Sequence, residues 1–75
     1  MFGKRLRHMR MKHNFTQPQM ANLLGIALRT YQGYEGGTRN PSLDTLVNMG
    51  DILNVSVDYL LCRDAFLESL GIAID

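Results

Sequence analysis

Apolar side chains recur at intervals of three or four residues along most of the chain, which is the spacing of one face of an α-helix. The first run of this kind predicts a helix over residues 2–13, with an apolar face that consists of Phe2, Leu6, Met9 and His13. Asn14 follows at a position where helices often end in a left-handed residue. We therefore expect the chain to turn at Asn14.

The second predicted helix has a clearly marked start. Thr16 and Gln19 form a T-x-x-Q capping box, in which the threonine side chain binds a backbone amide and the glutamine side chain reaches back to the cap. The apolar pattern then predicts a helix over residues 17–24. Gly25 ends this helix in a tight turn, and Ile26 is expected to fill the space before the next helix.

A third and shorter helix is predicted over residues 28–35, with Tyr31 and Tyr34 pointing inward. Gly36 and Gly37 are expected to end it. Helical spacing leaves four residues on its outer side, namely Leu28, Arg29, Gln32 and Gly33.

Two more helices are predicted in the second half of the chain. Pro41 and Ser42 open a fourth helix, and Asn54 ends it. A glycine at position 50 costs about 1 kcal/mol relative to alanine inside a helix, so we infer that another helix packs there too closely for a side chain. Ser56 caps a fifth helix, which makes the chain a compact all-α domain. The apolar positions of these two helices are Leu43, Leu46, Met49, Leu53, Val57, Leu60 and Leu61.

The composition excludes several classes of protein. A chain of 75 residues has room for one domain and no large substrate cavity. Its single cysteine, Cys62, cannot form an internal disulfide or a cysteine-rich zinc site, and His8 and His13 are poorly spaced to share a metal. No apolar run approaches the roughly 20 residues of a membrane span, and no secretion signal is evident. We expect a cytoplasmic protein without catalytic activity, cofactor, metal or small-molecule substrate.

Charge is distributed unevenly along the chain, although the net charge is only +1. Residues 1–40 carry seven basic residues and one acidic residue, a net charge of +6, whereas residues 41–75 have a net charge of −5. A basic first half would attract phosphates, and the attraction would weaken as salt rises. Charge alone leaves open the alternative of a solvated basic surface without a partner. The side chains of the first helix expected in solvent are Lys4, Arg5, Arg7 and Lys12.

Two short helices joined through Gly25 and Ile26 match the geometry of a helix-turn-helix, in which the second helix enters the major groove of DNA. Further motifs agree in order and spacing: FTQPQMA at 15–21, LGI at 24–26, YEGG at 34–37, NPSL at 40–43 and VSVDYLL at 55–61. In these segments the chain resembles the lambda-repressor-like helix-turn-helix family, also called the xenobiotic-response-element family. The resemblance implies a five-helix DNA-binding domain over residues 1–63, followed by a short C-terminal tail over residues 64–75.

The resemblance also implies roles for individual residues. Gln17 matches a glutamine that grips a phosphate at the start of the second helix, where backbone amides also favour anions. Arg29 and Gln32 have the side chains that pair with guanine and adenine in the major groove, and Thr30 is expected to contact a phosphate. For each of these residues, an exposed side chain without a DNA contact remains the alternative.

The loop after the third helix and the first helix contribute further expected residues. Arg39 and Asn40 lie where relatives contact phosphates, although a solvated loop is nearly as consistent with the sequence. Arg10 and Glu35 match a structural ion pair between the first helix and the end of the third.

Three residues depart from the family pattern. Ala27 stands where relatives usually have a serine or threonine cap, and the missing acceptor costs about 1 kcal/mol. Leu28 and Gly33 occupy positions where many relatives have polar base-reading residues. Leu28 could contact a thymine methyl and Gly33 could permit close approach, and both are compatible with weak discrimination.

Two functions from different classes remain open. The first is a sequence-specific transcription regulator, most simply a repressor, that binds an inverted repeat in double-stranded DNA as a homodimer. The apolar residues of the tail would then form the dimer contact or fold back over the first helix: Phe66, Leu67, Leu70, Ile72 and Ile74. The second is a protein-interaction module of the same fold, of the antitoxin or anti-repressor type, which the expected exposure of Leu23 and Leu28 favours.

Overall fold

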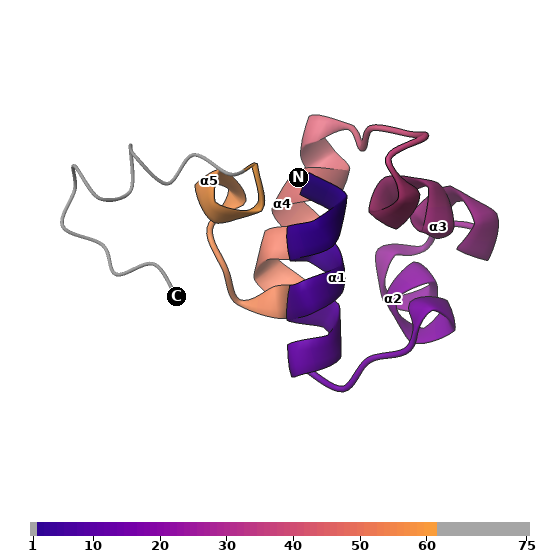
Figure 1. The fold of residues 1–75 in the computed structure, drawn as a ribbon, viewed down its shortest axis with the longest axis horizontal. Coiled ribbons are helices and arrows are strands. Elements are labelled where there is room, and N and C mark those ends of the chain that lie inside the picture. Colours follow the sequence, from indigo (N-terminus) through magenta and orange to yellow (C-terminus); the bar gives the residue numbers. More distant parts are fainter. Residues whose placement is uncertain (1, 62–75) are drawn as a thin grey trace, which may run out of the picture.

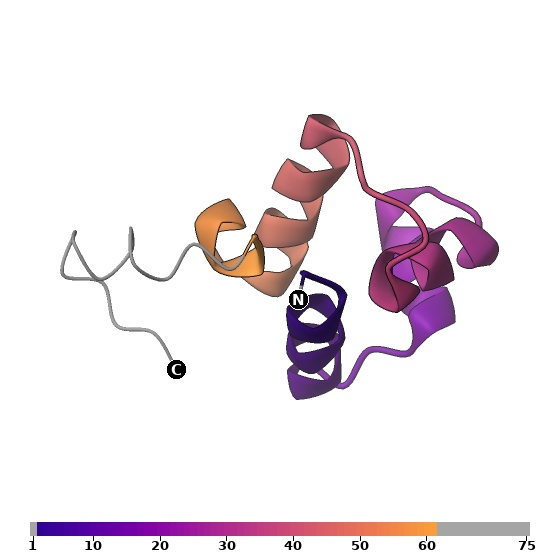
Figure 2. The ribbon, with the colours of Figure 1, turned by 45° about the horizontal axis from the view of Figure 1, so that its top comes forward.

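The computed structural model describes residues 2–61, and these fold into five helices with no strand, as the sequence predicts. Helices α2 and α3 lie together at one end of the molecule, α1 and α4 form its middle, and α5 lies at the opposite end (Figures 1 and 2). The bounds are Phe2–Lys12 for α1, Gln17–Leu24 for α2, Leu28–Gly36 for α3, Leu43–Leu53 for α4 and Val57–Leu60 for α5.

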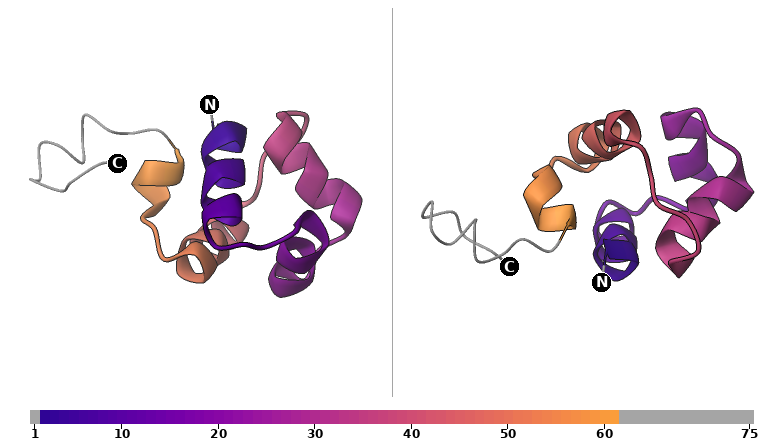
Figure 3. Two further views of the ribbon diagram at one scale, coloured as in Figure 1. Left: turned by 60° about the horizontal axis from the view of Figure 1, so that its bottom comes forward. Right: turned by 90° about the horizontal axis from the view of Figure 1, so that it is seen from above.

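One hydrophobic core holds the helices together. Helix α1 packs against α3 and α5, and α4 packs against α2 and α5, so each helix buries its apolar face against at least one other. The views in Figure 3 show α1 lying between α5 and the α2–α3 pair. The largest fully buried side chains come from all five helices, and they are Leu6, Met20, Tyr31, Met49, Leu53 and Leu60.

Local capping sets the ends of the helices. The side chains of Thr16, Ser42 and Ser56 each accept a hydrogen bond from the first turn of the helix that follows. Asn14 and Asn54 adopt φ angles of 60° and 55° and end α1 and α4 in the left-handed conformation. Both of these helix ends are confirmed as predicted. Helix α3 runs one residue further than expected, because Gly36 remains helical and only Gly37 is left-handed.

Several expectations from the pattern are wrong. Leu61, expected among the apolar positions of the fifth helix, lies just after α5 and is 42% exposed. Leu43 keeps the apolar spacing but is 71% exposed at the first position of α4. The close neighbour of Gly50 is the carbonyl oxygen of Val55 in the following loop, 2.9 Å from the position of a Cβ atom, rather than another helix. Arg5 is half-buried, because its guanidinium lies over the ring of Tyr59 and donates a hydrogen bond to the Tyr59 carbonyl.

The segment from residue 62 onward lies outside the described residues, and so do the predictions made for Cys62 and for the tail. Among residues 2–61, no helix has the length and apolar character that a membrane span requires.

Candidate nucleic-acid interface

Helices α2 and α3 are joined by a tight turn with well-defined hydrogen bonds. The amide of Gly25 donates to the Asn22 carbonyl, and the amide of Ile26 donates to the Ala21 carbonyl, with Gly25 in the left-handed conformation at φ 69°. This pattern is a Schellman motif, which satisfies the last carbonyls of α2 and reverses the chain. As a result, only three residues separate α3 from α2, and α3 packs directly against it.

The start of α3 has no side-chain cap. Ala27 holds the extended N-cap conformation without a side-chain hydrogen bond, as its sequence predicts. The helix is held instead by the packing of Tyr31 and Tyr34, both of which are buried. Tertiary contacts therefore substitute for the missing cap.

The outer side of α3 presents polar side chains to solvent. Arg29 and Gln32 are exposed, Leu28 is 39% exposed, and Thr30 is half-buried at the edge of this surface. Arg29 has no hydrogen bond or ion pair to any described residue, so its guanidinium is available to a ligand. Leu28, Arg29 and Gln32 are thus exposed on the outer side, as the sequence predicts.

Gly33 lies on the outer side of α3 as expected, but it is buried and does not present a free surface. Its carbonyl accepts hydrogen bonds from the amides of Gly37, Thr38 and Arg39, at 2.9, 3.0 and 3.2 Å. These bonds fold the loop after α3 back over the helix, and the Arg39 side chain then covers the position. Helical spacing correctly gives the direction in which position 33 points, but it carries no information on which segment covers it.

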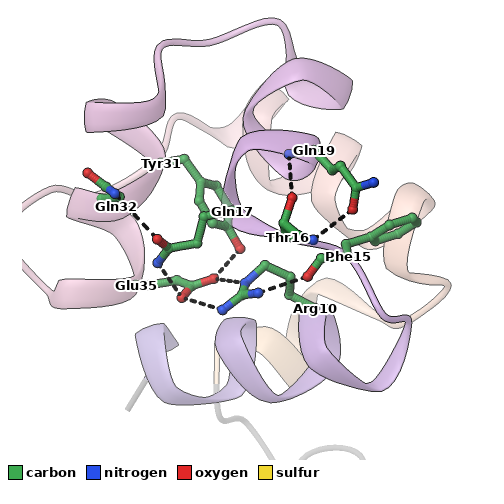
Figure 4. Close-up of polar contacts among 8 residues, drawn as sticks. All are labelled: Arg10, Phe15, Thr16, Gln17, Gln19, Tyr31, Gln32 and Glu35. Carbon is green, nitrogen blue, oxygen red and sulfur yellow. Dashed lines mark hydrogen bonds and ion pairs between the residues drawn. The ribbon is translucent and has the colours of Figure 1, made fainter.

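Gln17 is tied into a hydrogen-bond network instead of extending into solvent (Figure 4). Its Nε2 donates to Oε1 of Glu35 at 3.1 Å, and its Oε1 accepts a bond from Gln32 Nε2 at 3.4 Å. Gln17 is the first residue of α2 and Gln32 lies on the outer side of α3, so this bond links the two helices at the surface. The backbone amides of the first turn of α2 lie beside this bond, and such amides favour anions.

The ion pair expected between Arg10 and Glu35 is present. Arg10 donates from Nε to Glu35 Oε2 at 2.6 Å and from Nη2 to Oε1 at 3.3 Å, and its Nη1 donates to the Phe15 carbonyl. The two side chains are only 12% and 5% exposed. The hydroxyl of Tyr31 also donates to Glu35, so one carboxylate accepts bonds from α1, α2 and α3.

These contacts set the protonation states of the network. Burial would raise the pKa of Glu35, but the bonds from Arg10, Tyr31 and Gln17 outweigh it and hold that pKa below its usual value. The bond to Glu35 raises the pKa of Arg10, and burial together with the bond to Glu35 raises the pKa of Tyr31. The network is therefore a carboxylate held by a cation and two neutral donors at neutral pH.

A polar hollow adjoins this network, and it is lined by Arg7, Arg10, Gln17, Gln32, Glu35 and Gly36. Arg7 is exposed and has no hydrogen bond or ion pair to the described residues. Sequence reasoning assigned it only to solvent. Its position one turn before Arg10 is the signal that could have placed it beside Gln17 and Gln32.

The loop residues Arg39 and Asn40 are both exposed, in the stretch between α3 and α4. The acidic helix α5, which carries Asp58, lies at the end of the molecule away from α3 (Figure 1). Within residues 2–61, α5 therefore does not cover the outer side of α3.

Comparison with known proteins agrees with this geometry. A family model described as helix-turn-helix matches residues 6–60. The chain is 46% identical over 61 residues to YqaE, an HTH-type transcriptional regulator of Bacillus subtilis (strain 168), and 42% identical over 66 residues to the cryptic phage CTXphi transcriptional repressor RstR of Vibrio cholerae. These matches cover 81% and 88% of the chain.

Among solved structures, the biofilm master regulator SinR in complex with DNA superposes with a TM-score of 0.75 at 29% identity, over 81% of this chain and 98% of that one. The chain spans 53% of the length of YqaE and 59% of that of RstR, so it corresponds to about half of these relatives. The family model covers most of the described residues, including both helices of the candidate interface. The chain therefore belongs to the lambda-repressor-like helix-turn-helix family.

Proposed function

We propose that this chain binds double-stranded DNA, with α3 in the major groove and the start of α2 against a phosphate. The observation that carries the proposal is the exposed pair Arg29 and Gln32 on the outer side of α3, with Gln32 hydrogen-bonded to Gln17 at the start of α2. In helix-turn-helix proteins the second helix reads base edges while the first contacts the backbone. SinR, which shares the fold and whose crystal structure was solved in complex with DNA, supports DNA binding by this fold.

Each candidate residue has a role suited to its chemistry. Arg29 would pair with O6 and N7 of guanine, and Gln32 with N6 and N7 of adenine. Leu28 would contact a thymine methyl group. Phosphate contacts would come from Gln17, Thr30 and Asn40, with Arg7 adding positive charge beside Gln17. Arg39 would contact DNA from the loop after α3. Gly33 has no direct contact in this proposal, because the loop covers it.

A gel-shift titration at several salt concentrations tests DNA binding. Because phosphate contacts release counterions, the affinity should fall steeply with salt, and the Arg29→Ala variant should lose about 5- to 150-fold on its preferred sequence. Lys4→Ala is the matched control, since Lys4 is exposed on α1 and is not a candidate contact residue. Binding that does not respond to salt, or equal losses in the two variants, would contradict the proposal.

The finer role we propose is that of a repressor acting as a homodimer on an inverted repeat. One domain of this size covers a short half-site, and a two-fold assembly doubles the contacts. The name of the relative RstR, a transcriptional repressor, supports repression. The apolar tail residues, which lie outside the described residues, would supply the dimer contact. Replacing Leu70, Ile72 and Ile74 with polar residues should lower the mass in solution, and an unchanged mass would exclude a tail-mediated dimer.

A protein-interaction module is the second candidate function. The observation that favours it is the exposure of Leu23 (52%) and Leu28 (39%) on adjacent helices of the interface. Apolar side chains at such positions suit a protein surface as well as a thymine methyl group. If the gel-shift titration finds no duplex that the chain binds in a salt-dependent manner, a protein-interaction module becomes the preferred function in place of DNA binding.

A further inference from the structure

Position 33 lies on the side of α3 that would face DNA. It follows Arg29 by four residues, which on a helix places the two positions one above the other. A side chain at this position would project next to that of Arg29 on the outer side. This chain has glycine there, so no side chain from α3 itself can use the space.

Arg39 occupies this space instead. A Cβ atom built on Gly33 would lie 2.9 Å from both Cγ and Cδ of Arg39 and 3.1 Å from Oγ1 of Thr38. The aliphatic part of the Arg39 side chain therefore lies directly on the α3 backbone, at the point where a side chain of residue 33 would begin. Any larger residue at position 33 would push Arg39 away.

The backbone holds Arg39 in this position. The amides of Gly37, Thr38 and Arg39 all donate to the carbonyl of Gly33, so the loop is fixed to the last turn of α3. The guanidinium of Arg39 has no hydrogen bond or ion pair to any described residue, and the residue as a whole is exposed. The Arg39 side chain is therefore held at its base on the outer side of α3, while its guanidinium is available to a ligand.

We propose that Arg39 is a specificity-determining residue that reads a guanine from the loop, in place of a base-reading side chain at position 33. The inference rests on the proposed DNA-binding function and deepens it. A guanidinium pairs with O6 and N7 of guanine through two parallel hydrogen bonds, whereas a phosphate contact needs only positive charge. An arginine that only binds a phosphate from a loop does not need to pack against the recognition helix. The packing of Arg39 on Gly33 therefore favours base reading over a simple phosphate contact.

Selection of bound duplexes from a random pool tests the proposal, with the unchanged chain and with Arg39→Lys. Lysine keeps the charge but lacks the planar pair of donors. The unchanged chain should select guanine at one position of each half-site that Arg39→Lys no longer selects. Discrimination at that position should fall about 5- to 150-fold in competition gel shifts, while the salt dependence stays unchanged. Arg29→Lys should relax a different position.

Two glycine variants give an independent check. Gly33→Ala should weaken the same guanine preference, because the new methyl group displaces Arg39. Gly36→Ala should leave the preference intact, since a Cβ atom there meets nothing within 4 Å. Circular dichroism would establish that all variants are folded.

The outcomes separate the inference from the proposed function. If the unchanged chain selects no sequence, the DNA-binding proposal itself fails. If it selects a sequence and Arg39→Lys selects the same one, Arg39 does not read a base and the inference is wrong. Arg39→Ala would then weaken binding to all sequences equally. It would also reduce the slope of affinity against salt concentration by the amount expected for about one phosphate contact.

Discussion

Replacing Tyr31 with phenylalanine removes one hydroxyl from the centre of the network that joins α1, α2 and α3. Tyr31 is fully buried, and its hydroxyl donates to the Glu35 carboxylate. A hydrogen bond to a charged group contributes about 1.5–3 kcal/mol to stability. A domain of this size has roughly 4–11 kcal/mol in total, so the loss is a large fraction. We expect the melting temperature to fall by about 6–24 °C.

The loss should depend on pH, and its direction follows from Glu35. The folded state holds the pKa of Glu35 below its usual value of 4.5, so the carboxylate stabilises the fold above that value. This stabilisation is lost as pH falls through the lower pKa of the folded state. In Tyr31→Phe the pKa of Glu35 should rise toward 4.5, because one of its donors is gone. The difference between the two proteins should therefore shrink as pH falls below 4.5, and it should approach about 0.5–1.5 kcal/mol once Glu35 is protonated and a neutral pair replaces the charged one.

Urea unfolding followed by circular dichroism, at neutral pH and at a series of pH values below 4.5, measures both quantities. Tyr34→Phe is the matched control: Tyr34 lies on the same helix and is also buried, but its hydroxyl makes no hydrogen bond to the described residues. It should cost less than about 0.5 kcal/mol. Equal losses in the two variants, or a Tyr31→Phe loss that does not change with pH, would refute the assignment of Tyr31 as a donor to an ionised Glu35.

Three further predictions concern stability and are measured by the same unfolding assay. Gly3→Ala should destabilise the fold by about 1–3 kcal/mol, because a Cβ atom there would lie 2.3 Å from the Glu35 carbonyl oxygen. The control Gly36→Ala should be neutral or stabilising, because a Cβ atom there meets open space. If Gly3→Ala were also neutral, α1 and α3 would be able to move apart at no cost. Ala27→Ser should stabilise the protein by about 1 kcal/mol by supplying the missing cap of α3, and no gain would indicate that this helix start is already satisfied. Thr16→Ala should cost about 1 kcal/mol through loss of the capping box, with a smaller loss showing that Gln19 holds the turn alone.

The helix boundaries were predictable from the sequence because their causes are local. A cap such as Thr16 or a left-handed residue such as Asn14 acts within one turn of itself, so its effect can be read from neighbouring residues. The ion pair between Arg10 and Glu35 spans 25 positions, and only the family resemblance indicated it.

Close approaches between distant segments could not be predicted. Gly3 lies against the α3 backbone and Gly33 lies under Arg39, but a glycine in a helical pattern does not reveal which neighbour excludes a side chain. The same limit explains Arg5, whose partner Tyr59 lies 54 positions away. In the candidate interface, residue types and helix faces were predictable, whereas the covering of position 33 by a loop depends on the folded backbone.

The shared carboxylate of Glu35 has a consequence for the kinetics of recognition. Because α1, α2 and α3 each donate to it, the angle between α2 and α3 is set before any ligand arrives. Few residues of these helices then need to become ordered when a ligand binds, so the entropic cost of association is small. On the proposed function, such a protein should meet a DNA duplex as a nearly rigid body, at a rate governed by diffusion and charge instead of by folding on the DNA.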